Sequence, residues 1–276
     1  MNASSRKRVR DMQRNTHRKR RRQYLIRRAA VLIIGIIILV LIIAGIRSCG
    51  GNNAADGPVV TVLPGVVVPQ STKVPTANAV GNVTAADVNQ SYFANSCFVG
   101  NSMIEGMEIY ELVDGADYFA KIGLNVTDAL TDAMDNGTVP VIDELNNDRQ
   151  YRKIFMMFGE NELSWSNTEK FKDDYSAIIQ KAKQYQPSAQ IYLLSITPIS
   201  ETAEAEGENG ASKEKILEFN GYIKEVAEEN SVAYVDLYGG LANENGYLPE
   251  NAATDGIHFS EDYYAKFLVY IQVNYD

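Results

Sequence analysis

Cys97-Phe98-Val99-Gly100-Asn101-Ser102-Met103-Ile104-Glu105-Gly106 is the stretch around which the rest of the chain can be interpreted. Its apolar start predicts a short buried strand that ends at Gly100, and Ser102 then falls at the beginning of a helix. A helix N-terminus carries free N–H groups that can hold a developing oxyanion. A serine hydroxyl becomes a nucleophile when a base takes its proton and such donors are present. Because Gly-x-Ser is common by chance, its meaning depends on residues downstream.

The chain after residue 84 alternates between short apolar runs and helical patterns. Strands are predicted at 96–99, 118–122, 154–158, 191–196 and 232–237. Helices are predicted at 103–112, 126–134, 168–185, 213–230 and 261–273, and a helix cap at 84–87 leads into 88–92. Apolar strands that alternate with helices are typical of a parallel sheet covered on both faces. The sequence therefore predicts an α/β fold with about five parallel strands, whose ligands bind beyond the carboxyl ends of the strands.

Of the two histidines, His17 and His258, only His258 lies in this α/β segment. It ends the loop Asp255-Gly256-Ile257-His258, in which Asp255 can turn back and accept the imidazole N–H. That contact would fix the tautomer and stabilise the imidazolium that forms when the ring takes a proton. The same residues could also form an ordinary Asp-Gly turn with a histidine that caps the last helix.

Two more candidates follow predicted strands. Asn161, in Gly159-Glu160-Asn161-Glu162, could aim its amide into the site as an oxyanion donor, or it could cap a helix. Gly123 comes after the second strand and could offer a backbone N–H to the same oxyanion. Alternatively, this glycine could serve only to form a turn.

Taken together, Ser102, Gly123, Asn161 and the pair Asp255 and His258 resemble the sequence blocks of the SGNH (GDSL-like) hydrolases, in the same order and at the same strand ends. The resemblance covers residues 85–276. It implies a flavodoxin-like three-layer α/β/α sandwich and acyl-ester chemistry without a metal or cofactor. It also implies that Ser102 is the nucleophile, His258 the base and Asp255 the residue that orients the base. The N–H groups of Ser102 and Gly123 and the amide of Asn161 would then form the oxyanion hole.

The chain departs from the family pattern at two positions. Asn101 stands where the family usually has Asp, and Glu162 ends a block that more often ends in Asp. Both residues are candidates for substrate positioning. Trp165, the only tryptophan, could be a platform on which a sugar stacks, or a packed loop anchor, and the anchor is favoured because large aromatic side chains mostly serve burial.

The N-terminal part of the chain has the composition of a membrane anchor. Residues 1–28 hold 12 of the 26 lysines and arginines and one of the 35 acidic residues, whereas the net charge of the whole chain is −9. Ala29–Ile46 is an uncharged apolar run of 18 residues, which as a helix would span about 27 Å of the bilayer. We therefore predict a basic cytoplasmic tail (1–28), a transmembrane signal anchor (29–46), a proline-containing linker (47–84) and an extracytoplasmic domain (85–276).

Other interpretations of this N-terminal part are weaker. The apolar run is long for a cleaved signal peptide, and no small-residue cleavage site follows it. Cys49 could be lipidated, but Arg47 is a poor fit to such processing. Cys49 and Cys97 could pair outside the cell, although Cys97 is expected to be an inert core thiol. The adjacent membrane span explains the basic tail, so no nucleic-acid partner is expected.

The expected function is that of a single-pass membrane protein whose outer domain is a serine ester hydrolase. Its substrate would be an O-acyl group, with acetyl favoured, on cell-envelope carbohydrate within reach of the linker. The acidic outer domain disfavours a phospholipase that binds anionic lipid. An O-acyltransferase acting on cell-wall glycan and a non-catalytic glycan-binding module with a decayed site remain as alternatives.

Overall fold

The computed structural model describes residues 83–135, 137–207 and 210–275. Within these ranges no helix is long and apolar enough to cross a membrane. The predicted basic tail, the transmembrane segment Ala29–Ile46 and nearly all of the predicted linker lie outside the described residues.

One five-stranded parallel sheet forms the centre of this fold. Its strands are β1 Ser96–Gly100, β2 Asp117–Ala120, β3 Lys153–Met157, β4 Gln190–Leu194 and β5 Ala233–Val235. They lie in the order β2-β1-β3-β4-β5, and every neighbouring pair is parallel, so the predicted parallel sheet is confirmed. The chain first moves outward from β1 to β2 and then crosses back to β3. The carboxyl ends of β1 and β3 therefore border the point where the winding reverses, which is where ligands bind in such sheets.

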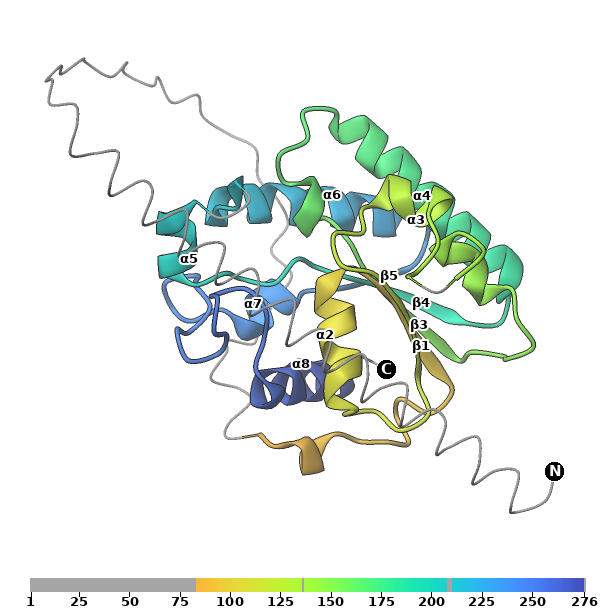
Figure 1. Cartoon of the computed structure of the whole chain (residues 1–276), viewed down its shortest axis with the longest axis horizontal. Coiled ribbons are helices and arrows are strands. Elements are labelled where there is room, and N and C mark those ends of the chain that lie inside the picture. Colours follow the sequence, from red (N-terminus) through yellow and green to blue (C-terminus); the bar gives the residue numbers. More distant parts are fainter. Residues whose placement is uncertain (1–82, 136, 208–209, 276) are drawn as a thin grey trace, which may run out of the picture. The chain divides into compact units, whose positions relative to one another are not determined.

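Helices cover both faces of the sheet and complete the three layers of a flavodoxin-like sandwich (Figure 1). One face carries α2 Ser102–Tyr110, α7 Leu237–Leu241 and α8 Glu261–Asn274, and the other carries α3 Val126–Thr131, α4 Thr168–Tyr185 and α6 Lys213–Glu229. Successive strand residues point to opposite faces, so Cys97 and Val99 join the core under α3, α4 and α6, and Phe98 joins the core under α2, α7 and α8.

Aromatic side chains join neighbouring strands on the α2–α8 face. Phe98 of β1, Phe155 of β3 and Tyr192 of β4 stack in sequence, with 5.0 Å between the ring centroids of each adjacent pair. Cross-strand pairs of this kind stabilise a sheet and its register. The register of β1 and β3 matters because the candidate residues Ser102 and Asn161 closely follow the carboxyl ends of these two strands.

Several short elements differ from the sequence-based predictions. The predicted helix 126–134 ends at Thr131, because Asp132 leaves the helical conformation and its carbonyl accepts the N–H of Val141 at 2.9 Å. The predicted strand 232–237 ends at Val235, because Asp236 caps α7. The predicted helix through residue 92 is only the 3₁₀ turn Ala85–Asp87. The short helices η3 Val141–Leu145, α5 Glu201–Glu206 and α7 were not predicted.

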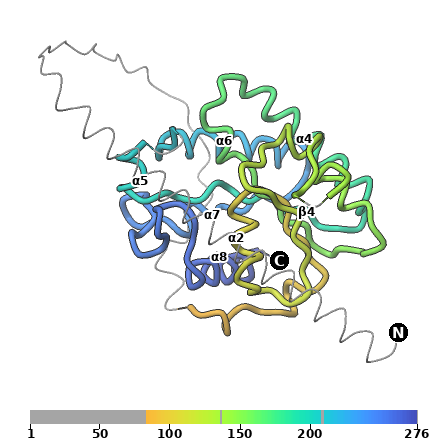
Figure 2. The backbone as a smooth tube through the Cα atoms, viewed as in Figure 1, coloured from red at the N-terminus to blue at the C-terminus, as the bar shows by residue number. Residues whose placement is uncertain are grey.

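Helix α8 packs against α2, which carries Ser102 at its first turn (Figure 2). The buried hydroxyl of Tyr264 on α8 donates a hydrogen bond to the carbonyl of Met103 at 2.8 Å. This approach requires a glycine on α2, because a Cβ on Gly106 would lie 2.3 Å from the Tyr264 hydroxyl oxygen. Gly106 thus lets the last helix hold the turn that positions Ser102.

Gly106→Ala is therefore expected to destabilise the protein, although alanine is the better helix former. Overpacking at a buried contact costs about 1–3 kcal/mol, which exceeds the roughly 1 kcal/mol that alanine gains in a helix. Urea unfolding followed by circular dichroism measures the change. Gly221→Ala is the matched control, because a Cβ there on α6 meets nothing within 4 Å. Equal effects of the two substitutions would contradict this account of the α2–α8 contact.

Candidate active site

Ser102 lies at the N-terminus of α2, directly beyond the carboxyl end of β1, and 8% of it is exposed. Asn101 is the N-cap of this helix, and its Oδ1 accepts the N–H of Met103 at 3.0 Å. The N–H of Ser102 belongs to the first turn and has no acceptor within the helix. The serine therefore presents both a hydroxyl and a backbone donor at the positive end of a helix dipole.

His258 connects Ser102 to Asp255. Its Nε2 lies 2.9 Å from the Ser102 Oγ, and its Nδ1 lies 2.9 Å from Oδ2 of Asp255. A carboxylate can only accept, so the imidazole proton sits on Nδ1 and Nε2 is left to accept the serine hydroxyl proton. This is the arrangement in which a histidine acts as base toward serine.

Asp255 is locked in place by its own loop. Its Oδ1 accepts the N–H groups of Ile257 at 3.1 Å and His258 at 2.8 Å. Burial alone would raise the pKa of Asp255, but the hydrogen bond and charge of His258, together with these N–H donors, hold it well below its usual range. The carboxyl group therefore stays ionised through mildly acidic pH.

The loop that carries Asp255 and His258 is clamped against the connection that follows β4. Gly256 adopts φ +73°, and its carbonyl accepts the N–H of Ser200 at 2.8 Å. A Cβ on Gly256 would lie 2.2 Å from the Ser200 Oγ, so glycine is required both for the conformation and for the close approach. Phe259, directly after His258, is buried among the aromatic rings of α8. The imidazole is thus fixed from both sides.

Gly123 and Asn161 lie on adjacent loops beyond β2 and β3. The Nδ2 of Asn161 donates to the carbonyl of Leu124 at 2.9 Å, which ties the loop after β3 to the one after β2. This contact uses one of the two amide hydrogens and leaves the other as a donor. Gly123 and Asn161 are both exposed, so a substrate could reach them.

The structure corrects the expectation that Glu162 and Asn101 position the substrate. Neither side chain is exposed at all, so neither can contact a substrate. Glu162 accepts the N–H groups of Val126 at 2.8 Å and Gly159 at 3.0 Å, and so joins the start of α3 to the end of β3. Asn101 caps α2 as described above. Both residues support the loops that carry Ser102, Gly123 and Asn161.

Trp165 packs as a loop anchor, the role favoured from the sequence. It is half-buried against the hydrophobic core under α3, α4 and α6, and its backbone N–H donates to the carbonyl of Glu162 at 2.7 Å. Cys97 is a free thiol, fully buried in β1, and burial raises its pKa well above its ordinary value. Cys49, with which the alternative interpretation would pair it, lies outside the described residues.

Glu160 belongs to the site but was not singled out in the sequence. The residue as a whole is half-buried, the Oε2 of its carboxyl group lies 3.4 Å from the Asn101 Nδ2, and this group interacts electrostatically with His258 and Asp255. The sequence offered one signal, an acidic residue directly after the glycine that ends a strand. A single sequence does not tell which of two nearby glutamates, Glu160 or Glu162, turns toward the serine.

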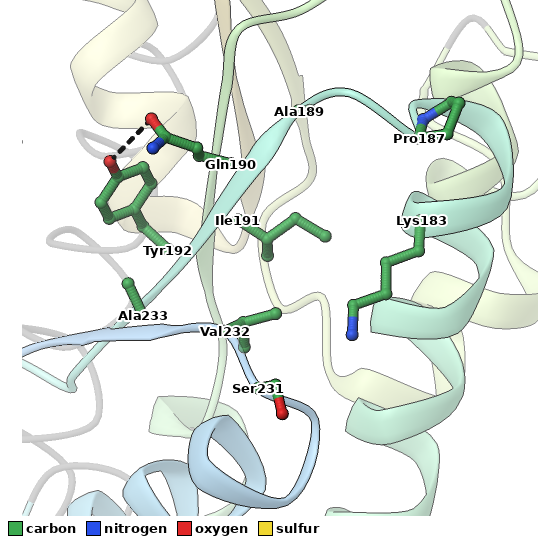
Figure 3. Close-up of a pocket in the computed structure, with 9 residues that line it drawn as sticks. All are labelled: Lys183, Pro187, Ala189, Gln190, Ile191, Tyr192, Ser231, Val232 and Ala233. Atoms are coloured by element: carbon green, nitrogen blue, oxygen red, sulfur yellow. Dashed lines mark hydrogen bonds between the residues drawn. The ribbon is translucent and has the colours of Figure 1, made fainter.

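A separate hollow of about 510 Å³ lies at the opposite end of the strands, where β4 and β5 begin (Figure 3). It is lined by the amino ends of β4 and β5, including Gln190 and Ala233, and by Lys183 of α4. Ser102, Asp255 and His258 are at the carboxyl ends of the strands and do not line it. The hollow is therefore distinct from the candidate active site.

Glu162→Gln should change how stability depends on pH. Burial raises the pKa of Glu162 from 4.5 to about 7, so the folded state binds a proton that the unfolded chain releases between these values. Stability supplied by this carboxyl group is therefore present below pH 4.5 and falls as the pH rises to 7, by up to about 3 kcal/mol. The difference in unfolding free energy between wild type and Glu162→Gln should shrink from pH 5 to pH 8 in urea titrations. A constant difference would show that Glu162 does not titrate in this way.

Comparisons with known proteins agree with this geometry. A family model described as the GDSL-like Lipase/Acylhydrolase family matches residues 98–266, which include Ser102, Gly123, Asn161, Asp255 and His258. No curated protein sequence matches the chain.

Solved structures from three bacteria are also similar. One described as a platelet activating factor from Streptococcus pneumonia is 24% identical over 65% of this chain and 82% of that chain, with a TM-score of 0.53, and at this identity it shows a shared fold. A GDSL-like lipase from Bacteroides thetaiotaomicron is 16% identical over 71% of this chain and 92% of that one, with a TM-score of 0.49. The acetylxylan esterase Axe2 from Geobacillus stearothermophilus is 14% identical over 66% and 94% of the two chains, with a TM-score of 0.45.

Proposed function

The chain belongs to the GDSL-like lipase/acylhydrolase (SGNH hydrolase) family and is an esterase, and we propose that it removes O-acyl groups from cell-envelope carbohydrate through an acyl-serine intermediate. The observation that carries the mechanism is the pair of 2.9 Å contacts by which His258 joins the Ser102 hydroxyl to the Asp255 carboxylate. These contacts give a serine, a base and an orienting carboxylate in the geometry that acyl transfer requires.

In the first half of the reaction, Ser102 Oγ attacks the ester carbonyl carbon while His258 Nε2 takes the hydroxyl proton. The new imidazolium is stabilised by Asp255, which stays ionised. The carbonyl oxygen becomes an oxyanion, for which the N–H groups of Ser102 and Gly123 and the free amide hydrogen of Asn161 are the donors. The bond to the alcohol then breaks, and His258 returns its proton to the leaving oxygen.

In the second half, water replaces the alcohol. His258 takes a proton from the water as its oxygen attacks the acyl-serine carbonyl carbon, and the same donors hold the second oxyanion. The bond to Ser102 Oγ breaks, the serine regains a proton from His258, and the carboxylic acid leaves. Both halves of the reaction therefore use the same residues of the chain.

Features of the whole sequence support the choice of carbohydrate as substrate. The predicted span Ala29–Ile46 and the proline-containing linker would place the domain outside the membrane, at the level of the cell envelope. Residues 29–276 contain 14 basic and 34 acidic residues, which disfavours close binding to anionic lipid. Acetyl esters of envelope glycans are the substrates that such an anchored domain could reach.

Ser102→Ala should abolish acyl release, by at least about 10³-fold, because the hydroxyl is the group that forms the covalent intermediate. The rate is measured with p-nitrophenyl acetate, and acetate released from isolated cell walls is measured by mass spectrometry. Ser188→Ala is the matched control, since Ser188 is exposed at the opposite edge of the sheet. Hydrolysis of p-nitrophenyl acetate that survives Ser102→Ala would refute the mechanism. Hydrolysis of this ester without acetate release from cell walls would refute the substrate alone.

A further inference from the structure

Glu160 brings a further carboxyl group to the serine, and the proposed reaction does not use it. It follows Gly159 at the end of β3, in the loop that also carries Asn161. The residue is half-buried, and its Oε2 lies 3.4 Å from the Nδ2 of Asn101, the residue that directly precedes Ser102. Burial raises the pKa of Glu160, whereas the charge of His258 and the hydrogen bond from Asn101 lower it.

Asn101 determines which way this carboxyl group faces. Its Oδ1 is committed to the N–H of Met103, so its Nδ2 must point the other way, toward Oε2 of Glu160 at 3.4 Å. An aspartate at position 101 could cap the helix equally well, but its second oxygen would then face the Glu160 carboxyl group. The amide at 101 therefore suits a carboxylate at 160, and the two residues form a hydrogen-bonded pair next to Ser102.

The charges around Glu160 come from two loops. His258 and Asp255 face it from the loop before α8, and Glu162 lies behind it in the same turn and interacts with it electrostatically. Asp255 is ionised and is neutralised by His258 only when the imidazole is protonated. With a neutral imidazole, which is the form that binds substrate, the site holds an excess of negative charge next to the Ser102 hydroxyl.

We propose that Glu160 is a specificity-determining residue, whose carboxylate makes the site reject esters that carry an anionic group near the scissile carbonyl and accept neutral, hydroxyl-bearing esters. This inference rests on the proposed hydrolase function and narrows its substrate class to uncharged acylated sugars. Two like charges about 8 Å apart at a partly screened site repel each other enough to change a rate constant by roughly 3- to 10-fold. A hydroxyl group nearby meets no such repulsion and can donate to the carboxylate instead.

The test compares two acetate esters with the same acyl group and the same aromatic ring, the anionic 4-acetoxybenzoate and its neutral methyl ester. Their kcat/KM values are measured at pH 8 with the full-length wild type and with Glu160→Gln, Glu160→Asp and Glu229→Gln. Glu229 is exposed at the far end of α6, so Glu229→Gln removes one negative charge from the protein without touching the site. The ratio of the two kcat/KM values cancels any general loss of activity that a change in packing would cause.

Glu160→Gln is expected to raise the ratio of anionic to neutral kcat/KM by roughly 3- to 10-fold, while Glu160→Asp and Glu229→Gln leave it within about 2-fold of the wild-type ratio. The proposal is overturned if Glu160→Gln leaves the ratio unchanged, or if Glu160→Asp shifts it as much as Glu160→Gln. It is also overturned if Glu229→Gln shifts it equally. If the wild type hydrolyses neither ester faster than Ser102→Ala does, the proposed hydrolase function is refuted as well. If the wild type hydrolyses the neutral ester faster than Ser102→Ala does, the hydrolase function stands, and only the proposed role of Glu160 is under test.

Discussion

The hydrogen bond between His258 Nε2 and Ser102 Oγ is the contact on which the rest of the account depends. It joins residues 156 positions apart, so it forms only if the first strand and the last loop of the domain are both correctly placed. On the serine side, β1 ends inside the sheet and α2 begins at once. On the histidine side, Gly256 and Phe259 fix the loop against its neighbours. Tyr264 then links the two sides by bonding to Met103.

Three carboxyl groups surround this contact, and their environments give them different tasks. Asp255 receives several donors and stays ionised, so it can orient and stabilise the imidazole. Glu162 is buried and joins two loops, and its raised pKa makes it sensitive to pH near neutrality. Glu160 lies between these extremes, and its electrostatic interaction with the imidazole is the basis of its proposed role in selecting substrates. Residues of one chemical type thus differ in role because burial and hydrogen bonding differ.

The strands could be predicted from the sequence because their apolar runs are nearly continuous, as buried parallel strands require. Gly123, Asn161, Asp255 and His258 could be identified because each follows an apolar run or precedes the last helix. The short helices α5, α7 and η3 could not, since helices of five or six residues give no lasting period. The burial of Glu162 and Asn101 also escaped prediction, because tertiary contacts alone determine which side of a tight turn a polar side chain faces.

The most direct measurement of the central claim is covalent labelling of the native protein by a fluorophosphonate, with the modified peptide identified by mass spectrometry. A serine hydroxyl that gives its proton to a neighbouring imidazole attacks the phosphorus and expels fluoride. The account predicts one adduct, on Ser102, that disappears in His258→Ala. An unlabelled Ser102 in the folded protein, or labelling that persists without His258, would contradict it.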